Sequence, residues 1–169
     1  CTEDIRFRDH SGIDARSLFR AVYGAFIGNN SGGASTITQQ LSKMLFTKKP
    51  KLGNSLSDKV KRIQQKQKEW VVSVELEKRY GKNEIITMYL NRFDWLNQAV
   101  GIKSAARVYF ETSPNKLTIN QSAMLVGMLK NPSSYNPVRN PEGTKTRRNV
   151  VLSQMMKYNK ITRKEYDSL

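Results

Sequence analysis

The chain has 169 residues and carries 29 Lys and Arg side chains against 14 Asp and Glu, which gives a formal net charge of +15. This length suits one domain with its own core, and no apolar run is long enough to span a bilayer. The single Cys excludes an internal disulfide, and His10 is the one histidine, so a His/Cys zinc cluster is excluded and carboxylates must carry any acid–base chemistry.

Apolar residues at helical spacing run through the N-terminal half. Together with the Gly, Pro and Asn residues that interrupt it, this spacing predicts the following elements in chain order: an irregular polar turn over 3–14, an amphipathic helix over 14–27, a helix over 36–46, a connection over 47–57, and helices over 57–79 and 84–90.

The C-terminal half continues the same pattern. It predicts a loop over 92–100 with Phe93 and Trp95 exposed, a helix over 102–110, an apolar helix opened by Thr118-x-x-Gln121 and ended by Asn131, an extended connection over 132–141, a helix starting at Arg147, and a last one capped by Thr162-x-x-Glu165. Strand signals are almost absent. We therefore expect an all-α fold, with a polar cleft rather than a simple bundle.

The stretch from Gly32 to Gln40 joins two glycines to a helix start. Thr36-x-x-Gln39 predicts a capping box after a flexible loop. Such a helix N-terminus favours a phosphate or carboxylate, and Lys43 adds a full charge further along. The alternative is that these side chains only cap the helix.

Basic residues crowd the next segment, opposed only by Asp58. They are Lys48, Lys49, Lys51, Lys59, Lys61, Arg62, Lys66 and Lys68. Such a surface attracts nucleic acid, anionic lipid head groups or a phosphorylated substrate. A solvated helix face is the alternative, but the run leads directly into Glu69.

Glu3 and Glu69 stand in settings that can perturb a carboxylate. If both reach one cleft, one can act as a base while the other works among cations that stabilise a departing anion. The alternative is that Glu3 frays at a terminus and Glu69 forms a surface pair with Lys66 or Lys68.

Five motifs follow one another along nearly the whole chain. They are Glu3-Asp4-x-x-Phe7-x-x-His10-x-Gly12, Gly33-x-Ser35-Thr36-x-Thr38-Gln39-Gln40, Gln65-Lys66-Gln67-Lys68-Glu69, Lys82-x-x-Ile85-Ile86-x-x-Tyr89-x-Asn91, and Arg147-Arg148-x-x-Val151-Leu152. In type and order this series resembles the transglycosylase domain of glycosyltransferase family 51, the peptidoglycan glycosyltransferases of class A penicillin-binding proteins and their monofunctional relatives.

The resemblance implies a lysozyme-like helical fold in two lobes, a head and a jaw with the active cleft between them, within a single domain over 1–169. It also implies polymerisation of lipid II, a disaccharide-peptide on undecaprenyl diphosphate, into β-1,4 glycan strands with inversion at the anomeric carbon. Glu3 matches the general base that deprotonates the acceptor hydroxyl. Glu69 matches the residue that acts at the diphosphate, directly or through a divalent cation such as Mg or Mn, and no organic cofactor is implied.

The remaining motif side chains are expected to bind substrate or to shape the surroundings of the base. They are Asp4, Phe7, His10, Ser35, Thr36, Gln39, Gln40, Lys43, Lys66 and Lys68. A departing diphosphate needs neutralisation more than a strong acid, which the lysines supply. We expect His10 to be a hydrogen-bonding scaffold and Arg147 and Arg148 to hold motif segments in register.

The chain departs from the family pattern in several places, among them a longer connection between the second and third motifs and the loop Arg92-Phe93-Asp94-Trp95-Leu96 after Asn91. Gln65 replaces the Arg of the third motif, so a bidentate guanidinium is missing there. Glu111 stands where a Gly normally follows Tyr109 and Phe110.

Two other classes of function compete with this one. A lysozyme-like hydrolase or lytic transglycosylase is disfavoured because cleavage of peptidoglycan requires no diphosphate site. A non-catalytic module that binds polyanions or membranes is disfavoured because aromatic residues do not interleave with the basic run, and we expect no nucleic-acid partner.

The lipid tail of the substrate predicts a membrane surface as a partner. We expect the domain at the outer face of the bacterial cytoplasmic membrane, on the periplasmic side in a Gram-negative cell, anchored by a segment outside this chain and fused to a transpeptidase domain. Phe93, Trp95 or apolar residues flanking 41–46 are expected to enter the lipid.

Overall fold

The structure is a computed structural model that describes residues 3–16, 19, 23, 35–46 and 55–169. The predicted helix over 14–27 lies largely outside these residues. So do several residues of the glycine-rich and basic stretches, namely Gly32, Gly33, Lys48, Lys49 and Lys51.

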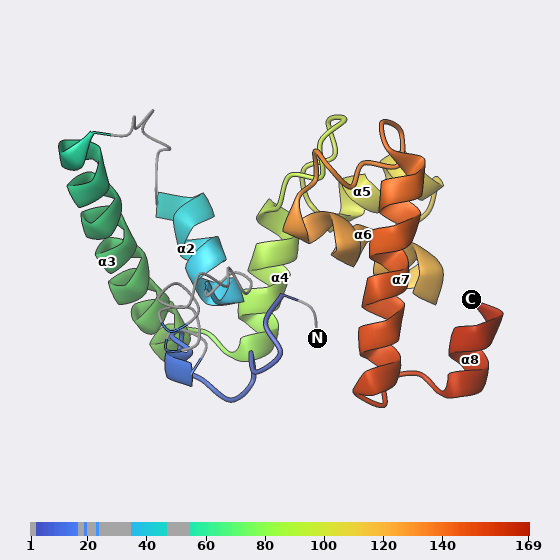
Figure 1. Ribbon diagram of the computed structural model, residues 1–169, viewed down its shortest axis with the longest axis horizontal. Coiled ribbons are helices and arrows are strands. Elements are labelled where there is room, and N and C mark those ends of the chain that lie inside the picture. Colours follow the sequence, from blue (N-terminus) through green and yellow to red (C-terminus); the bar gives the residue numbers. More distant parts are fainter. Residues whose placement is uncertain (1–2, 17–18, 20–22, 24–34, 47–54) are drawn as a thin grey trace. The chain divides into compact units, whose positions relative to one another are not determined.

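The described residues form helices in this order: α2 (Ile37–Phe46), α3 (Leu56–Arg79), α4 (Lys82–Arg92), α5 (Ile102–Phe110), the 3-10 turn η1 (Pro114–Lys116), α6 (Ile119–Lys130), α7 (Pro141–Lys157) and α8 (Arg163–Ser168) (Figure 1). No described residue belongs to a strand, although Asp94 and Val100 form an isolated bridge. The all-α fold class is confirmed, while the lysozyme-like pairing of lobes stays a prediction. None of the described helices combines the length and the apolar character needed to cross a bilayer.

The chain divides into two compact units. The α2–α3 unit comprises Arg6–Tyr89, and the α6–α7 unit comprises Cys1–Ile5 with Leu90–Leu169. The division falls inside α4, close to its C-terminal end.

In the α2–α3 unit, α2 packs along α3 (Figure 1). Helix α3 has Ser55 as its N-cap, since the Ser55 hydroxyl accepts a hydrogen bond from Asp58 N–H at 3.2 Å. The core is not purely apolar, because Thr38, Ser42 and Ser73 are as fully buried as Leu41 and Ile85. Buried hydroxyl groups need partners, so polar contacts help to specify this packing.

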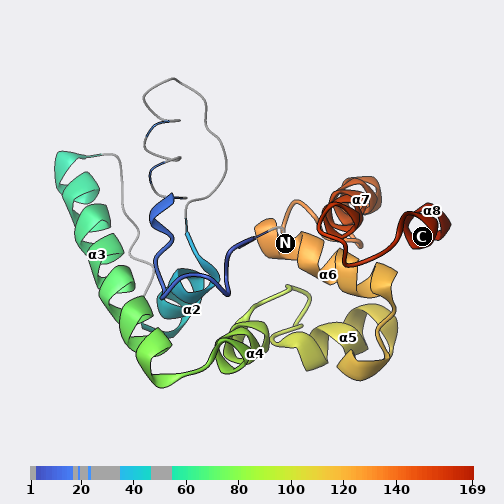
Figure 2. The same cartoon turned by 90° about the horizontal axis from the view of Figure 1, so that it is seen from below.

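In the α6–α7 unit, α7 packs against both α6 and α8 (Figures 1 and 2). Gly127 lets α6 and α7 approach closely, since a Cβ there would lie 3.1 Å from Arg147 Cγ. Capping boxes predicted at Thr118 and Thr162 are both confirmed, with the Gln121 and Glu165 side chains returning to the backbone N–H of the capping residue.

Helix α7 begins earlier than predicted. We expected it to start at Arg147, but Asn140 caps it by accepting a hydrogen bond from Gly143 N–H at 3.0 Å, and Pro141 is its first residue. Proline is well placed there because the first helical N–H has no intrahelical acceptor. The extended connection is correspondingly shorter than 132–141.

Trp95 is buried, so the prediction that it is exposed is wrong. Its side chain is 0% exposed, its indole N–H donates to the Leu125 carbonyl oxygen at 3.1 Å, and Phe93 packs edge-on against it with ring centroids 4.9 Å apart. Phe93 itself is half-buried. The loop therefore contributes a side chain to the hydrophobic core of the α6–α7 unit. The Trp95 indole is stable there because it packs in an apolar cluster and its N–H has a hydrogen-bond acceptor on α6.

Candidate active site

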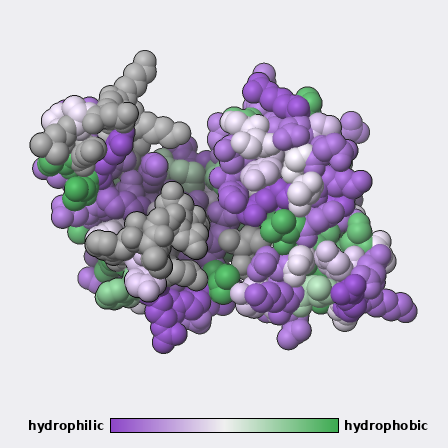
Figure 3. Space-filling view, in the orientation of Figure 1, coloured by the Kyte–Doolittle hydropathy of each residue, from purple (hydrophilic) through white to green (hydrophobic). Residues whose placement is uncertain are grey.

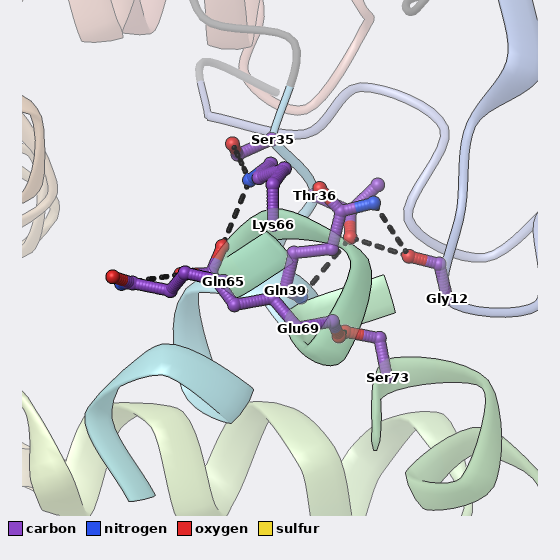
Figure 4. A network of polar contacts seen from close by, with 8 residues as sticks. All are labelled: Gly12, Ser35, Thr36, Gln39, Gln65, Lys66, Glu69 and Ser73. Carbon is purple, nitrogen blue, oxygen red and sulfur yellow. Dashed lines mark hydrogen bonds and ion pairs between the residues drawn. The ribbon is translucent and has the colours of Figure 1, made fainter. Parts of the chain in front are cut away.

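Gly12, from the first motif, joins its loop to α2 and α3 (Figure 4). Its φ is +89°, and a Cβ would lie 2.8 Å from the Ser73 carbonyl oxygen, so both its conformation and its surroundings require glycine. The Gly12 carbonyl accepts hydrogen bonds from Thr36 Oγ1 at 2.7 Å and from Gln39 Nε2 at 3.3 Å. These hydrogen bonds connect the first motif to the second.

Thr36 and Gln39 form only half of the predicted capping box. Gln39 N–H donates to Thr36 Oγ1 at 3.2 Å, but Gln39 Oε1 does not accept a hydrogen bond from Thr36 N–H, and Gln39 Nε2 donates to the Gly12 carbonyl oxygen. The predicted reciprocal box is therefore wrong: the Gln39 amide is oriented by the hydrogen bond from its Nε2 to Gly12, and its Oε1 accepts from no donor among the described residues. Both side chains are buried, and Gln39 Oε1 has no hydrogen-bond donor among the described residues. That oxygen is an acceptor without a protein partner in the second motif.

Glu69, from the third motif, is only 4% exposed and lies between two donors from its own helix (Figure 4). Lys66 Nζ lies 3.0 Å from its Oε2, and Gln65 Nε2 donates to its Oε1 at 3.2 Å. Lys66 Nζ also donates to Ser35 Oγ at 2.8 Å. The alternative of a solvated surface pair is contradicted for Glu69, and the predicted residues Ser35, Lys66 and Glu69 form one connected cluster.

Gln65 stands where the motif resemblance leads us to expect an Arg, and it forms a hydrogen bond there. Its neutral amide donates once to Glu69, so Lys66 is the only cation with a contact to this carboxylate among the described residues. The cluster is accordingly less positive than one that carries a guanidinium at this position.

Lys82, from the fourth motif, contacts the first-motif loop. Its Nζ lies 2.7 Å from Glu77 Oε2, lies 4.7 Å from the Phe7 ring centroid and donates to the His10 carbonyl oxygen. Glu77 also accepts a hydrogen bond from Thr38 Oγ1. Lys82 therefore links the first-motif loop to the end of α3.

The His10 side chain forms contacts within its own loop. Its Nδ1 accepts a hydrogen bond from Gly12 N–H at 3.2 Å, which requires that nitrogen to be unprotonated. The His10 ring also packs edge-on against Phe7, with centroids 6.3 Å apart. These contacts stabilise the loop that follows Glu3 and Asp4.

Glu3 belongs to the α6–α7 unit and pairs there with Arg147 of the fifth motif. Arg147 Nη2 lies 3.1 Å from Glu3 Oε1, and the two side chains are only 11% and 16% exposed. Burial raises the pKa of Glu3 above its ordinary value, although the charges of Arg147 and Lys130 act in the opposite direction. A carboxylate with a raised pKa is well suited to accept a proton near neutral pH.

Arg147 is a second residue whose contact, here with Glu3, was not predicted. Its Nε donates to the Gly127 carbonyl oxygen at 3.5 Å, and its guanidinium carbon lies 5.8 Å from the Tyr135 ring centroid. Arg147 thus connects the fifth motif to the first, which agrees with the expectation that it holds motif segments in register.

The remaining predicted residues occupy more peripheral positions. Asp4 is half-buried, and Gln40 Oε1 accepts a hydrogen bond from Tyr89 OH at 3.0 Å. Lys43 is exposed in the last turn of α2, and Lys68 is exposed on α3. These two lysines are free to meet a ligand from solvent, whereas Gln40 is occupied within the unit.

Among the described residues, Glu69 is the one carboxylate in the cluster with Ser35 and Lys66 that could bind a divalent cation. The described residues contain no group of three His, Cys, Asp or Glu side chains that could form a cage. Glu69 can still supply one oxygen ligand, which suits Mg²⁺ because that ion commonly keeps waters and takes its other ligands from substrate phosphates. Lys66 competes for the same carboxylate.

Comparison with known proteins agrees with the motif pattern. The family model described as Transglycosylase matches residues 1–156. The chain is 42% identical over 168 residues to penicillin-binding protein 1A/1B of Bacillus subtilis, 39% over 168 residues to penicillin-binding protein 1A of Haemophilus influenzae, and 38% over 167 residues to penicillin-binding protein 1A of Escherichia coli.

These alignments cover 98%, 99% and 98% of this chain but only 17%, 18% and 18% of the respective relatives. The chain thus spans less than a fifth of their length. Across that span the match includes all the motifs that carry Glu3, Glu69 and Arg147. The chain belongs to the transglycosylase family.

Proposed function

We propose that this chain is a peptidoglycan glycosyltransferase that polymerises lipid II into β-1,4 glycan strands and releases undecaprenyl diphosphate. Membership of the transglycosylase family supports the class of reaction. The observation that carries the residue assignment is Glu3, a carboxyl group with a raised pKa held by Arg147 at the position of the family's general base.

In the proposed step, the Glu3 carboxylate removes the proton from the acceptor sugar hydroxyl. The resulting oxygen attacks the anomeric carbon of the donor, and the bond between that carbon and the diphosphate oxygen breaks with inversion. Glu3 retains the proton, and the diphosphate leaves as an anion. The activation barrier of glycosyl transfer is lowered in two ways, because the acceptor is held in position and its proton is removed in the same complex.

The Ser35, Lys66 and Glu69 cluster is proposed to receive the leaving diphosphate. Lys66 supplies a cation and Ser35 a hydroxyl, while exposed Lys43 and Lys68 add charge from solvent. Glu69 holds Lys66 in place, and a divalent cation bound at Glu69 would supply further charge neutralisation. Gln39 Oε1 is the acceptor that a substrate donor group would satisfy.

The complete protein is proposed to work at the outer face of the cytoplasmic membrane, on the periplasmic side in a Gram-negative cell. The substrate would be lipid II with the growing glycan chain. The relatives are named penicillin-binding proteins, so we propose that the complete protein also carries a transpeptidase domain and an anchor outside this chain.

The test is polymerisation of labelled lipid II by the chain, with and without added Mg²⁺ or EDTA. We expect glycan strands from the wild type, none from Glu3→Gln, and strong loss from Glu69→Gln. Degradation of preformed glycan without polymerisation would instead support the hydrolase. Full activity of folded Glu3→Gln would contradict the assignment of the base, and full activity in EDTA would exclude the divalent cation.

A further inference from the structure

Glu77 is a buried carboxylate of α3 that lies outside the five motifs and takes no part in the proposed reaction. Its side chain is only 5% exposed, and it lies in the last turn of the helix. Both its burial and its place at the negative end of the helix dipole disfavour a charged carboxylate. The contacts of Glu77 must therefore compensate for these two costs.

The two carboxylate oxygens of Glu77 have partners from two different motifs. Oε1 accepts a hydrogen bond from Thr38 Oγ1 at 2.5 Å, and Thr38, in the first turn of α2, is 0% exposed. Oε2 lies 2.7 Å from the Nζ of Lys82, the first residue of α4. One carboxylate thus connects the starts of α2 and α4 to the end of α3.

Lys82 extends this connection to the loop of the first motif. Besides its ion pair, its Nζ donates a hydrogen bond to the His10 carbonyl oxygen and lies 4.7 Å from the Phe7 ring centroid. A lysine ammonium group has three N–H donors, so it can satisfy Glu77 and His10 at the same time. Because the lysine stem is flexible, the ion pair with Glu77 restricts it to an orientation that reaches the loop.

The side of α3 that carries Glu77 also carries the cluster at Glu69. Four polar residues recur at intervals of three and four along this side, at positions 66, 69, 73 and 77. Figure 4 shows the first three of them. Lys66 Nζ donates to Ser35 Oγ at 2.8 Å, just before α2, while Glu77 accepts from Thr38 within α2. The start of α2 is therefore attached to α3 at two points, and all these residues belong to the α2–α3 unit.

We propose that Glu77 is a positioning residue for glycosyl transfer. Through Thr38 it fixes the first turn of α2, and through Lys82 it fixes the first-motif loop. Ser35 and Lys66 are then held together where the leaving diphosphate would be received. The inference rests on the proposed function for the reaction itself. A misplacement of about 1 Å at such a cluster can lower the rate about 10²-fold.

The test replaces Glu77 by glutamine, which keeps an oxygen for the Thr38 hydroxyl but cannot form the ion pair with Lys82. The matched control is Glu75→Gln, which removes the same charge from a salt-bridged position on α3 that is 48% exposed. We expect kcat with lipid II to fall about tenfold or more in Glu77→Gln, with little change in KM, because the affected contacts form with the leaving group. Glu75→Gln should retain the wild-type kcat.

Rates are measured well below the melting temperature of each variant, so that loss of folded protein does not contribute. Thr38→Ser and Thr38→Val then separate positioning from general packing, because only serine retains the hydroxyl group that Glu77 accepts from. We expect Thr38→Ser to keep most of the wild-type kcat and Thr38→Val to lose it. This pair carries the same test if Glu77→Gln does not fold.

The loop is followed without substrate through His10, the one histidine of the chain. Its Nδ1 accepts a hydrogen bond from Gly12 N–H, so the ¹⁵N signal of this ring nitrogen and the amide signal of Gly12 report on the loop. In Glu77→Gln both NMR signals should shift in the same direction as in Lys82→Met. Glu75→Gln should leave both at their wild-type positions.

Each contrary result has a distinct meaning. Unshifted His10 and Gly12 signals in Glu77→Gln would overturn the connection through Lys82. Shifted signals with an unchanged kcat would overturn the positioning role, as would equal losses of kcat in Glu77→Gln and Glu75→Gln or in the two Thr38 variants. Failure of the wild type to polymerise lipid II would contradict the proposed function instead, and the His10 signals would still decide whether Glu77 places the loop.

Discussion

Arg147 Nη2 lies 3.1 Å from Glu3 Oε1 although the two residues are 144 positions apart in the sequence. The pair places a cation against a carboxyl group whose pKa is raised by burial, so two opposed effects set the protonation of the proposed base. Arg147 is itself fixed by the Gly127 carbonyl and the Tyr135 ring. The geometry indicates a positioning residue for Glu3.

The first prediction concerns the pH dependence of polymerisation. Because Glu3 must be deprotonated to act as a base, activity should rise with pH through its raised pKa, above the ordinary glutamate value of about 4.3. Arg147→Gln removes the charge that lowers this pKa, so the rising limb should move to higher pH. The measurement is kcat/KM for lipid II against pH. Arg148→Gln is the matched control, and an unchanged limb in Arg147→Gln would contradict the pairing.

Stability gives a second measure of the same pKa. The folded state prefers protonated Glu3, so this group contributes stability that is lost as pH rises through its folded pKa. Glu3→Gln removes this decrease in stability because a glutamine side chain does not ionise. The difference in free energy of unfolding between Glu3→Gln and the wild type should therefore grow in favour of the variant as pH increases, which denaturant titrations at several pH values would detect.

The next prediction concerns the buried carboxylate of Glu69. Lys66→Ala removes its cation and a hydrogen bond to Ser35, and an unsatisfied buried charge costs roughly 1–3 kcal/mol or more. We expect lower stability and a strong loss of kcat. Lys68→Ala changes an exposed lysine on the same helix and should affect KM more than stability. Equal effects of the two substitutions on unfolding would show that the Lys66 contact is unimportant.

Local signals allowed much of the fold to be predicted. Capping boxes at Thr118 and Thr162 are encoded within four residues, so sequence alone placed them correctly. The same kind of signal is present in Asn140-Pro141, an N-cap residue followed by a proline at the first helical position, so the sequence also encodes the earlier start of α7. Helix boundaries that depend on caps are therefore recoverable from sequence.

Tertiary contacts explain what the sequence could not reveal. Trp95 sits in a polar loop, and its burial depends on a carbonyl and an apolar surface supplied by α6. Gln39 does not complete its capping box, because its amide is oriented by a hydrogen bond from Nε2 to the carbonyl oxygen of Gly12, which is distant in sequence. The motif pattern identified Glu3 and Glu69, but the partners Arg147 and Gln65 required side-chain geometry.

A fourth prediction concerns Glu111, which stands where the motif resemblance leads us to expect a Gly. Its φ of 53° and ψ of 32° place it in the left-handed region at the C-terminal cap of α5, where a side chain costs energy. Glu111→Gly should therefore raise the free energy of unfolding by about 1 kcal/mol, or the melting temperature by about 2–4 °C. Lys103→Gly, inside the same helix, should lower stability by a similar amount. Destabilisation by Glu111→Gly would contradict the proposed strain.

The last prediction concerns membrane contact, and it starts from which apolar side chains are exposed. Phe46 and Ile63 are 65% and 60% exposed on α2 and α3, and Figure 3 shows hydrophobic surface where α3 lies. Trp95, in contrast, is 0% exposed. Of the anchors expected near 41–46 and at Trp95, only the first group can reach lipid without unfolding.

Phe46→Ser combined with Ile63→Ser should weaken binding to anionic liposomes about tenfold or more, because apolar area and nearby lysines act together at a membrane surface. Val138→Ser is the matched control, since it changes an apolar residue that is 74% exposed in the other unit. Trp95→Ala should instead cost about 3–5 kcal/mol of stability through a core cavity. Flotation of the double variant at the wild-type level, with its melting temperature unchanged, would exclude α2 and α3 as the lipid-binding surface.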